Sequence, residues 1–206
     1  MINVLINATT IVGDKDTHSA IEFIQAAESK SAPRITWHYA VSRTVARELL
    51  AIGPNLRSAY FFEQSPANSK SDRKRLKAIE ENIYADVVFT VSGPAYVRFD
   101  VPHICGVADG WVTDSILKAL RSASGVREMA ADFARSVYKG YWFSKADEWI
   151  VEASNAKQGL MERLRLPGKD IVILPTRSQD RYEALEREII ALGESTGDAS
   201  VERGLQ

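Results

Sequence analysis

The residues best placed to do chemistry follow two short apolar runs, Val87–Val91 and Val101–Val107, each typical of a buried strand. The first run ends at the turn Ser92–Pro94 and the second at Ala108–Trp111, and both turns contain glycine. In an open parallel sheet, ligands bind in the loops that follow the carboxyl ends of the strands. Glycine in such a loop lets a ligand approach the backbone closely. We therefore expect the functional site at these turns.

Asp109 and Trp111, in the second turn, suit the recognition of a sugar. A carboxylate can accept hydrogen bonds from hydroxyl groups or act as a general base, and an indole ring can stack on a sugar ring. Asp109 has a second interpretation, as the cap of a helix that starts after Gly110. The sequence leaves both roles open.

His103 and Cys105 lie two residues apart in the second apolar run, so a strand places them on the same face. A thiol and an imidazole can form a nucleophilic pair. No third, orienting group is visible, and the run is apolar. A buried structural cysteine and a hydrogen-bonded histidine are therefore the favoured interpretation, and His38 is interpreted in the same way.

The loop after the first strand carries Asp14, Asp16 and His18, whose side chains are of the types that bind metals. The alternative is a solvated loop whose acidic residues stabilise the N-terminus of the next helix. We favour the alternative and predict no metal site. This loop also holds a single glycine, Gly13, which argues against a dinucleotide fingerprint. A P-loop and a nucleophile elbow are absent as well, so no cofactor is expected.

The composition indicates an ordinary globular protein. The 206 residues are 45% hydrophobic and 26% charged, and the net charge of -1 gives no nucleic-acid footprint. One cysteine excludes an internal disulfide. The sequence begins without a recognisable signal peptide and has no apolar run of about 20 residues, so a cytoplasmic location is expected.

Two further patterns have a simple and a functional interpretation. The basic run Arg73–Lys77 is expected to be the solvated face of a helix, with peripheral contact to an anionic membrane as the alternative. The aromatic residues of Tyr138–Trp149 can form a carbohydrate platform, but their helical spacing favours core packing.

Apolar runs and helical segments alternate along the chain. This pattern predicts an α/β fold, a doubly wound and mostly parallel sheet flanked by helices of the Rossmann type. The strands are expected at Ile2–Asn7, Ile35–Val41, Tyr60–Phe62, Val87–Val91, Val101–Val107, Trp149–Val151 and Ile171–Leu174. Helices are expected from Thr17, after Ser42, over Asp72–Tyr84, from Thr113 to Ala146 and from Ser154 to Leu164.

The sequence predicts one Rossmann-like domain over residues 1–176 and a C-terminal segment over 177–206. This segment starts with a charged helix, Gln179–Leu192, that has few apolar positions. A small, polar and frayed tail is expected from Gly193 to the end.

Four segments, taken in order, resemble the N-terminal domain of GT-B glycosyltransferases of the bacterial family-four type, which build surface polysaccharides. They are MINVLINATTIVG, DVVFTVSGPAY, VPHICGVADGW and the stretch from YWFSKADEWIVEA to DIVILPT. The resemblance covers Ile2 to Thr176, and it rests on the joint order and spacing of the segments. It implies a retaining transfer of a sugar from a nucleotide diphosphate-sugar to an acceptor, with this domain forming the acceptor side of the cleft.

The resemblance also implies the residues of the cleft. His103 and Asp109 are the expected catalytic residues, and the expected substrate-binding residues are Gly13, Gly93, Pro94, Tyr96 and Trp111. The implied partners are a glycan or lipid-linked acceptor and a donor domain on another polypeptide, or a second copy of the chain.

The sequence departs from the family in two ways. The first loop carries Asp14 and Asp16, whose charges repel a diphosphate. The family's second domain, which binds the sugar nucleotide, does not follow Thr176. A non-catalytic remnant or binding module that keeps the acceptor surface is therefore the alternative, and a flavodoxin-like regulator is a further one.

Overall fold

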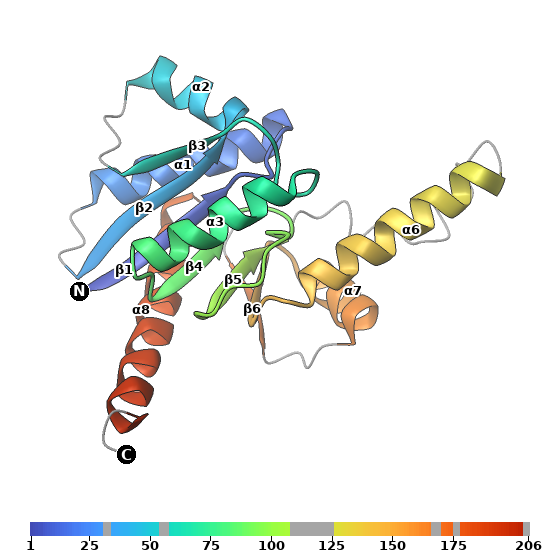
Figure 1. Ribbon diagram of the computed structural model, residues 1–206. Helices are drawn as coiled ribbons and strands as arrows, with labels where there is room; N and C mark the ends of the chain where they lie inside the picture. Colours follow the sequence, from blue (N-terminus) through green and yellow to red (C-terminus); the bar gives the residue numbers. More distant parts are fainter. Residues whose placement is uncertain (31–33, 54–57, 108–125, 166–169, 175–177, 204–206) are drawn as a thin grey trace.

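The computed structural model describes residues 1–30, 34–53, 58–107, 126–165, 170–174 and 178–203. Its centre is a seven-stranded sheet with the order β3-β2-β1-β4-β5-β6-β7, and every neighbouring pair of strands is parallel (Figure 1). The strands are β1 Ile2–Ala8, β2 Ile35–Ser42, β3 Ala59–Phe62, β4 Val87–Thr90, β5 His103–Gly106, β6 Glu148–Val151 and β7 Ile171–Ile173. The predicted doubly wound α/β fold is confirmed.

The central strand β1 is buried on both faces, which explains its nearly continuous apolar sequence. Val4 and Ile6 face one core cluster, and Leu5 faces the other. The strand pairs with β2 on one side and with β4 on the other, Asn7 lying beside Thr90. Chain order along the sheet therefore reverses between β1 and β4.

Helices cover both faces of this sheet. They are α1 Asp14–Ser29, α2 Arg43–Ile52, α3 Lys70–Asn82, α6 Val126–Phe143, α7 Ser154–Leu164 and α8 Ser178–Arg203. Side chains of α1, α2 and α8 join Val4 and Ile6 in one cluster, whereas α3 packs with Leu5 in the second. Figure 1 shows α6 extending away from the sheet, beyond the strands.

Local side chains set where several helices begin. The Ser42 hydroxyl accepts a hydrogen bond from the Val45 amide at 3.3 Å, as expected for an N-cap. Ser69 caps α3 through the Asp72 amide at 3.2 Å, so this helix begins before the predicted Asp72. Helix α7 begins at the predicted Ser154, and its N-cap is Ala153, which makes no capping hydrogen bond through its side chain.

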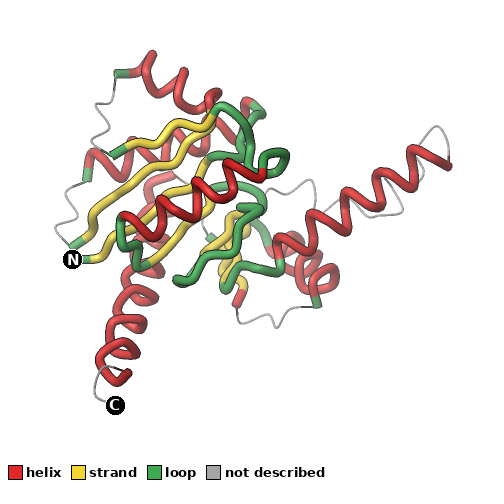
Figure 2. Tube along the Cα trace, viewed as in Figure 1, coloured by secondary structure: helices red, strands yellow, loops and turns green. Residues whose placement is uncertain are grey.

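The connection between β4 and β5 contains no helix. It is an irregular segment over residues 91–102, drawn as loop in Figure 2. Ala95, Val97 and Phe99 of this segment are buried against α3 and the sheet, so they replace a covering helix. The predicted strand from Val101 shortens to His103–Gly106 because the preceding residues belong to this packed loop.

The C-terminal helix α8 is longer and more firmly packed than its charged sequence predicts. It continues to Arg203, through the segment expected to be a frayed tail. Tyr182, Leu185 and Ile189 are at most 1% exposed and belong to the core cluster around β1. These three residues form a narrow apolar stripe with i, i+3, i+7 spacing. The stripe is difficult to recognise in the sequence because most of its neighbours are charged.

Within the ranges described above, no helix is long and apolar enough to cross a membrane.

Candidate functional site

Chain order in the sheet reverses between β1 and β4, and in open α/β sheets ligands bind at the carboxyl ends of the strands at such a reversal. We call this expected binding region the crevice. Two loops meet there, residues 9–13 after β1 and residues 91–102 after β4. The Thr10 hydroxyl donates a hydrogen bond to the Ser92 carbonyl at 3.2 Å. The Val91 amide donates to the Asn7 carbonyl at 3.0 Å. The two loops are therefore held together at the predicted site.

A buried polar network supports this crevice from below. The Asn7 amide donates to the Thr90 hydroxyl at 3.1 Å, and the Asn7 side-chain carbonyl accepts from the Thr9 amide and hydroxyl at 3.1 and 2.7 Å. All three residues are at most 1% exposed. Buried polar groups with satisfied hydrogen bonds fix a single arrangement, so the network orients the loop that follows β1.

His103 completes the network. Its Nε2 lies 2.8 Å from the Thr90 hydroxyl, and its ring meets Phe99 edge-on at 4.9 Å between ring centroids. The side chain is 2% exposed, and burial lowers the pKa of His103 to about 3. The imidazole is therefore neutral at physiological pH. This environment matches the hydrogen-bonded core histidine favoured from the sequence, and its predicted catalytic role stays a prediction.

Cys105 lies on the same side of the sheet as His103, but it does not pair with it. The Cys105 thiol donates to the Gly93 carbonyl at 3.1 Å. Burial raises the pKa of the Cys105 thiol far above its usual value, so the thiol stays protonated and is a poor nucleophile. It ties the loop after β4 to the end of β5.

Gly93 is required by the conformation of its backbone. Its φ of +79° lies in the left-handed region, and its amide donates to the Gly106 carbonyl at 2.9 Å. Gly106 was not among the predicted site residues. Glycine is required there because no side chain fits. A Cβ there would lie 2.1 Å from the Val91 carbonyl oxygen. The sequence did offer one sign of this role, because Gly106 is the glycine that ends the apolar segment HICG.

Gly13 differs from these two glycines. It is the N-cap of α1, with a φ of -96°, and a Cβ at this position would contact nothing within 4 Å. Gly13 is exposed beside the crevice, and its carbonyl accepts a hydrogen bond from the Thr17 hydroxyl at 2.9 Å. Glycine at this position therefore relieves no backbone strain. It leaves the N-terminus of α1 uncovered by a side chain.

Asp14, Asp16 and His18 belong to the first turns of α1. His18 is exposed and lies 3.2 Å from Glu22, one helical turn further on. Nowhere in the described residues do three or more His, Cys, Asp or Glu side chains gather as metal ligands. Asp14 and Asp16 lie in the first turn of the helix, where negative charge is stabilising.

Pro94 and Tyr96 continue the loop after β4. Pro94 is buried, and Tyr96 adopts a φ of +58°, unusual for a residue other than glycine. The Tyr96 ring stacks on Tyr138 of α6, with 5.8 Å between centroids, and lies 6.2 Å from the Trp142 ring. Burial raises the pKa of Tyr96. The aromatic residues of α6 thus pack on the predicted substrate-binding loop.

Lys139 of α6 was missed by sequence reasoning. Burial lowers the pKa of Lys139, and the negative charge of Asp16 partly opposes this change. The Lys139 ammonium group is therefore near enough to the first turn of α1 for its charge to interact with that of Asp16. A half-buried lysine beside a crevice is suited to bind a negatively charged group. Nothing in its local sequence distinguishes it from an ordinary helix-surface lysine.

Asp109 and Trp111 lie outside the described residues. Their predicted roles in sugar recognition therefore stay predictions. The same holds for the part of the predicted helix from Thr113 that precedes α6.

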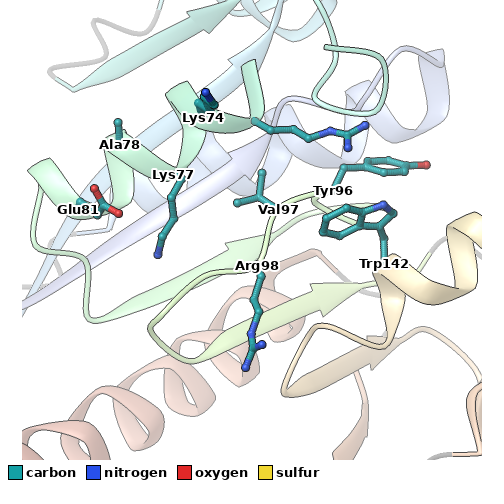
Figure 3. Close-up of a pocket in the computed structure, with 9 residues that line it drawn as sticks. Lys74, Lys77, Ala78, Glu81, Tyr96, Val97, Arg98 and Trp142 are labelled. Atoms are coloured by element: carbon teal, nitrogen blue, oxygen red, sulfur yellow. The ribbon is translucent and has the colours of Figure 1, made fainter. Parts of the chain in front are cut away.

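A groove of about 420 Å³ lies between α3 and the loop after β4 (Figure 3). We call it the basic groove, because four basic side chains line it, Arg73, Lys74, Lys77 and Arg98. Tyr96 and Trp142 line it as well. Of the predicted site residues that the structure describes, only Tyr96 lines this groove.

The sequence matches no protein-family model and no curated protein. Among solved structures, the chain is similar to the MnaA–UDP co-structure from S. aureus, with a TM-score of 0.58, 13% identity, and coverage of 84% of this chain and 45% of that chain. It is also similar to UDP-GlcNAc 2-epimerase from Neisseria meningitidis bound to UDP-GlcNAc, with a TM-score of 0.54, 11% identity, and coverage of 97% and 54%.

A third similar structure is UDP-N-acetylglucosamine 2-epimerase from Rickettsia bellii, with a TM-score of 0.53, 13% identity, and coverage of 92% of this chain and 49% of that chain. The chain spans about half the length of these proteins. At such identities the likeness establishes the fold alone, which is a Rossmann-like α/β fold.

Proposed function

We propose that this chain forms the acceptor side of a cleft in which a GT-B-type glycosyltransferase moves a sugar from a nucleotide diphosphate-sugar to an acceptor. The observation that carries the proposal is the reversal of chain order between β1 and β4. The loops after these two strands are tied together there by the hydrogen bond from Thr10 to Ser92. The similar solved structures support it, because one was solved with UDP and another is bound to UDP-GlcNAc.

The electrostatics at the crevice suit the acceptor better than the donor diphosphate. Asp14 and Asp16 lie in the first turn of α1, and their charges repel a diphosphate. Lys139 and the N-terminus of α1 supply positive potential on the same side. In this proposal, a second domain contributes the groups that stabilise the negative charge developing on the departing diphosphate.

The proposed roles of the catalytic candidates differ. Asp109 is assigned as the general base or as the carboxylate that binds a sugar hydroxyl. His103 acts through Thr90, because its ring is buried and its Nε2 contacts only that hydroxyl among the described hydrogen bonds. We therefore assign His103 as a positioning residue, which holds the polar network under the crevice.

The test is a transfer assay with the chain and the polypeptides encoded beside its gene. Radiolabelled nucleotide diphosphate-sugars and a lipid and glycan extract from the same cells are the substrates. Label is expected to move to an acceptor, and Asp109→Asn is expected to lower the rate by about 10²–10⁴-fold, the usual contribution of a general base. Unchanged transfer by Asp109→Asn would contradict the role of Asp109. Glu63→Gln, at an exposed carboxylate at the end of β3, is the matched control.

A non-catalytic binding module is the second candidate. It is favoured by the burial of both His103 and Cys105, which leaves no accessible nucleophile among the predicted residues that the structure describes. Binding of a glycan without any transfer, in the presence of every nucleotide sugar tested, identifies this case. Release of an epimerised sugar nucleotide without an acceptor would instead assign an activity like that of the similar solved structures.

A further inference from the structure

The basic groove runs along α3, from the carboxyl edge of the sheet toward its opposite edge. Because α3 leads from the end of β3 to the start of β4, its first turn lies at the carboxyl edge and its last turn at the amino edge. Figure 3 shows Tyr96 and Trp142 side by side at one end, Lys77 and Arg98 in the middle, and Glu81 at the other end. The groove therefore has an aromatic end and a charged middle.

Two of its basic residues are already engaged. The Lys77 ammonium lies 2.8 Å from the Asp100 carboxylate and also contacts Glu80. Burial alone would lower the pKa of Lys77, but its hydrogen bonds to these two carboxylates outweigh that effect and raise the pKa. Lys77 is therefore a structural cation that fixes the loop carrying Arg98.

Arg73 is held by the protein backbone. Its Nε donates to the Pro66 carbonyl at 2.5 Å, and its Nη2 donates to the Ala67 carbonyl at 2.7 Å and to the Tyr138 hydroxyl at 2.8 Å. Its guanidinium also lies 5.6 Å from the centre of the Trp142 ring. These contacts make the aromatic end rigid and electropositive before any ligand arrives.

Lys74 and Arg98 are different, because neither forms a salt bridge among the described residues. Arg98 acts on Asp100 only through its charge, which helps Lys77 to lower the pKa of that carboxyl group. Both are exposed, and they come from opposite walls of the groove, one from α3 and one from the loop after β4. Both residues line the groove, so their positive charges favour an anion there. Arginine in particular binds phosphate oxygens with two parallel hydrogen bonds.

The aromatic end provides a second, different surface. Tyr96 and Trp142 lie with their ring centroids 6.2 Å apart, and both line the groove. Aromatic rings of this kind offer an apolar surface to a ligand. The volume of about 420 Å³ lies within the range of small-molecule sites.

We propose that the basic groove binds a phosphorylated carbohydrate, with the phosphate held by Lys74 and Arg98 and the sugar ring on Tyr96 and Trp142. The binding does not depend on the transfer reaction. If the transfer function holds, this compound is the acceptor, and the groove directs its sugar end toward the crevice after β4.

The test uses the whole chain and measures binding directly. Glucose 1-phosphate, glucose and inorganic phosphate are titrated separately by isothermal calorimetry or by NMR. Glucose 1-phosphate is expected to bind, and more tightly than either half alone. Arg98→Gln is expected to weaken its binding by about tenfold, the loss of one charge-assisted contact. Trp142→Leu is expected to weaken the binding of glucose 1-phosphate but not the binding of inorganic phosphate.

The matched control is Arg47→Gln, which removes the same charge from an exposed position on α2, far from the groove in sequence and on the other face of the sheet. Thermal melting confirms that each variant is folded. The proposal is overturned if glucose 1-phosphate does not bind, or if Arg98→Gln and Arg47→Gln bind it equally. Either result leaves the transfer assay above unaffected, so the two failures can be told apart.

A vesicle experiment separates the two sources of a phosphate. Vesicles of phosphatidylcholine with and without phosphatidylglycerol are sedimented with the chain. Binding to the anionic vesicles that is lost in Arg98→Gln supports a lipid-linked phosphate in the groove. Vesicle binding that Arg98→Gln leaves unchanged, together with no binding of glucose 1-phosphate, overturns the groove as a phosphate site and assigns the basic face of α3 to membrane contact.

Discussion

Gly106 and Gly93 show how single residues shape the crevice. The Val91 carbonyl oxygen occupies the space where a side chain at Gly106 would start, and Gly93 turns with a positive φ directly above it. The Cys105 thiol donates a hydrogen bond to the Gly93 carbonyl, and the Gly106 carbonyl accepts one from the Gly93 amide. The backbone at the end of β4 therefore packs directly against the backbone at the end of β5, with no room for a side chain between them.

Gly106→Ala is expected to destabilise the protein by about 3 kcal/mol, because the new Cβ meets a backbone oxygen that cannot rotate away. Unfolding in urea measures the change. Gly13→Ala is the control, since nothing lies within 4 Å of the added Cβ, and it is expected to cost less than about 1 kcal/mol as a lost glycine N-cap. Equal effects of the two substitutions would contradict the close approach at Gly106.

His103 makes the stability depend on pH. Burial lowers the pKa of His103 to about 3, so the unfolded chain binds a proton that the folded chain refuses between pH 6.5 and about 3. The contribution of His103 is complete above pH 6.5 and declines as the pH falls, by up to about 1.4 kcal/mol per pH unit.

His103→Gln removes this titration and keeps a polar side chain beside Thr90. Its free energy of unfolding, measured in urea from pH 7 to pH 5, is expected to fall less steeply than that of the unsubstituted chain. The rest of the chain is identical in both proteins, so its contribution to the pH dependence cancels in the comparison. Parallel pH profiles would show that His103 is not a buried neutral group.

At the scale of elements, α8 ties the end of the chain to its start. Lys30 after α1 lies 2.8 Å from Glu183, and Arg34 at the start of β2 pairs with Glu194. A Cβ at Gly193 would lie 2.9 Å from the Ile2 side chain, so the helix passes directly over the first strand. The helix is part of the fold rather than an appendage.

Ile189→Ala is expected to destabilise the protein by about 2–5 kcal/mol, because Ile189 is fully buried between α8 and the sheet. Ile173→Ala removes the same atoms from a side chain that is 43% exposed, and it is expected to cost less than about 1 kcal/mol. Urea unfolding measures both. A small effect of Ile189→Ala would contradict the docking of α8.

The alternation of apolar runs and helical segments was enough to predict the elements and their parallel sheet. The sequence pattern failed to predict the structure where tertiary packing, rather than local periodicity, determines the conformation. The stripe of Tyr182, Leu185 and Ile189 is too narrow to stand out among charged neighbours. The loop after β4 replaces a helix with buried side chains, which no periodic pattern reveals.

At the scale of the whole molecule, the chain presents two adjoining surfaces, the crevice between β1 and β4 and the basic groove along α3. The crevice could be predicted because its glycines follow two apolar runs. The groove could not, because Lys74, Arg98 and Trp142 come together only when α3, a loop and α6 pack side by side. In the proposed function, the two surfaces together form one half of a cleft for a phosphorylated sugar compound.

The most direct test of the sugar-transfer site is to fill the crevice. Ser92→Trp places an indole at the mouth of the crevice, where the Ser92 carbonyl meets Thr10. Ser29→Trp places the same group at the exposed end of α1, at the opposite edge of the sheet. With both variants folded, transfer of radiolabelled sugar is expected to fall by at least about 100-fold for Ser92→Trp and to stay unchanged for Ser29→Trp. Full activity of Ser92→Trp would contradict a transfer site between β1 and β4.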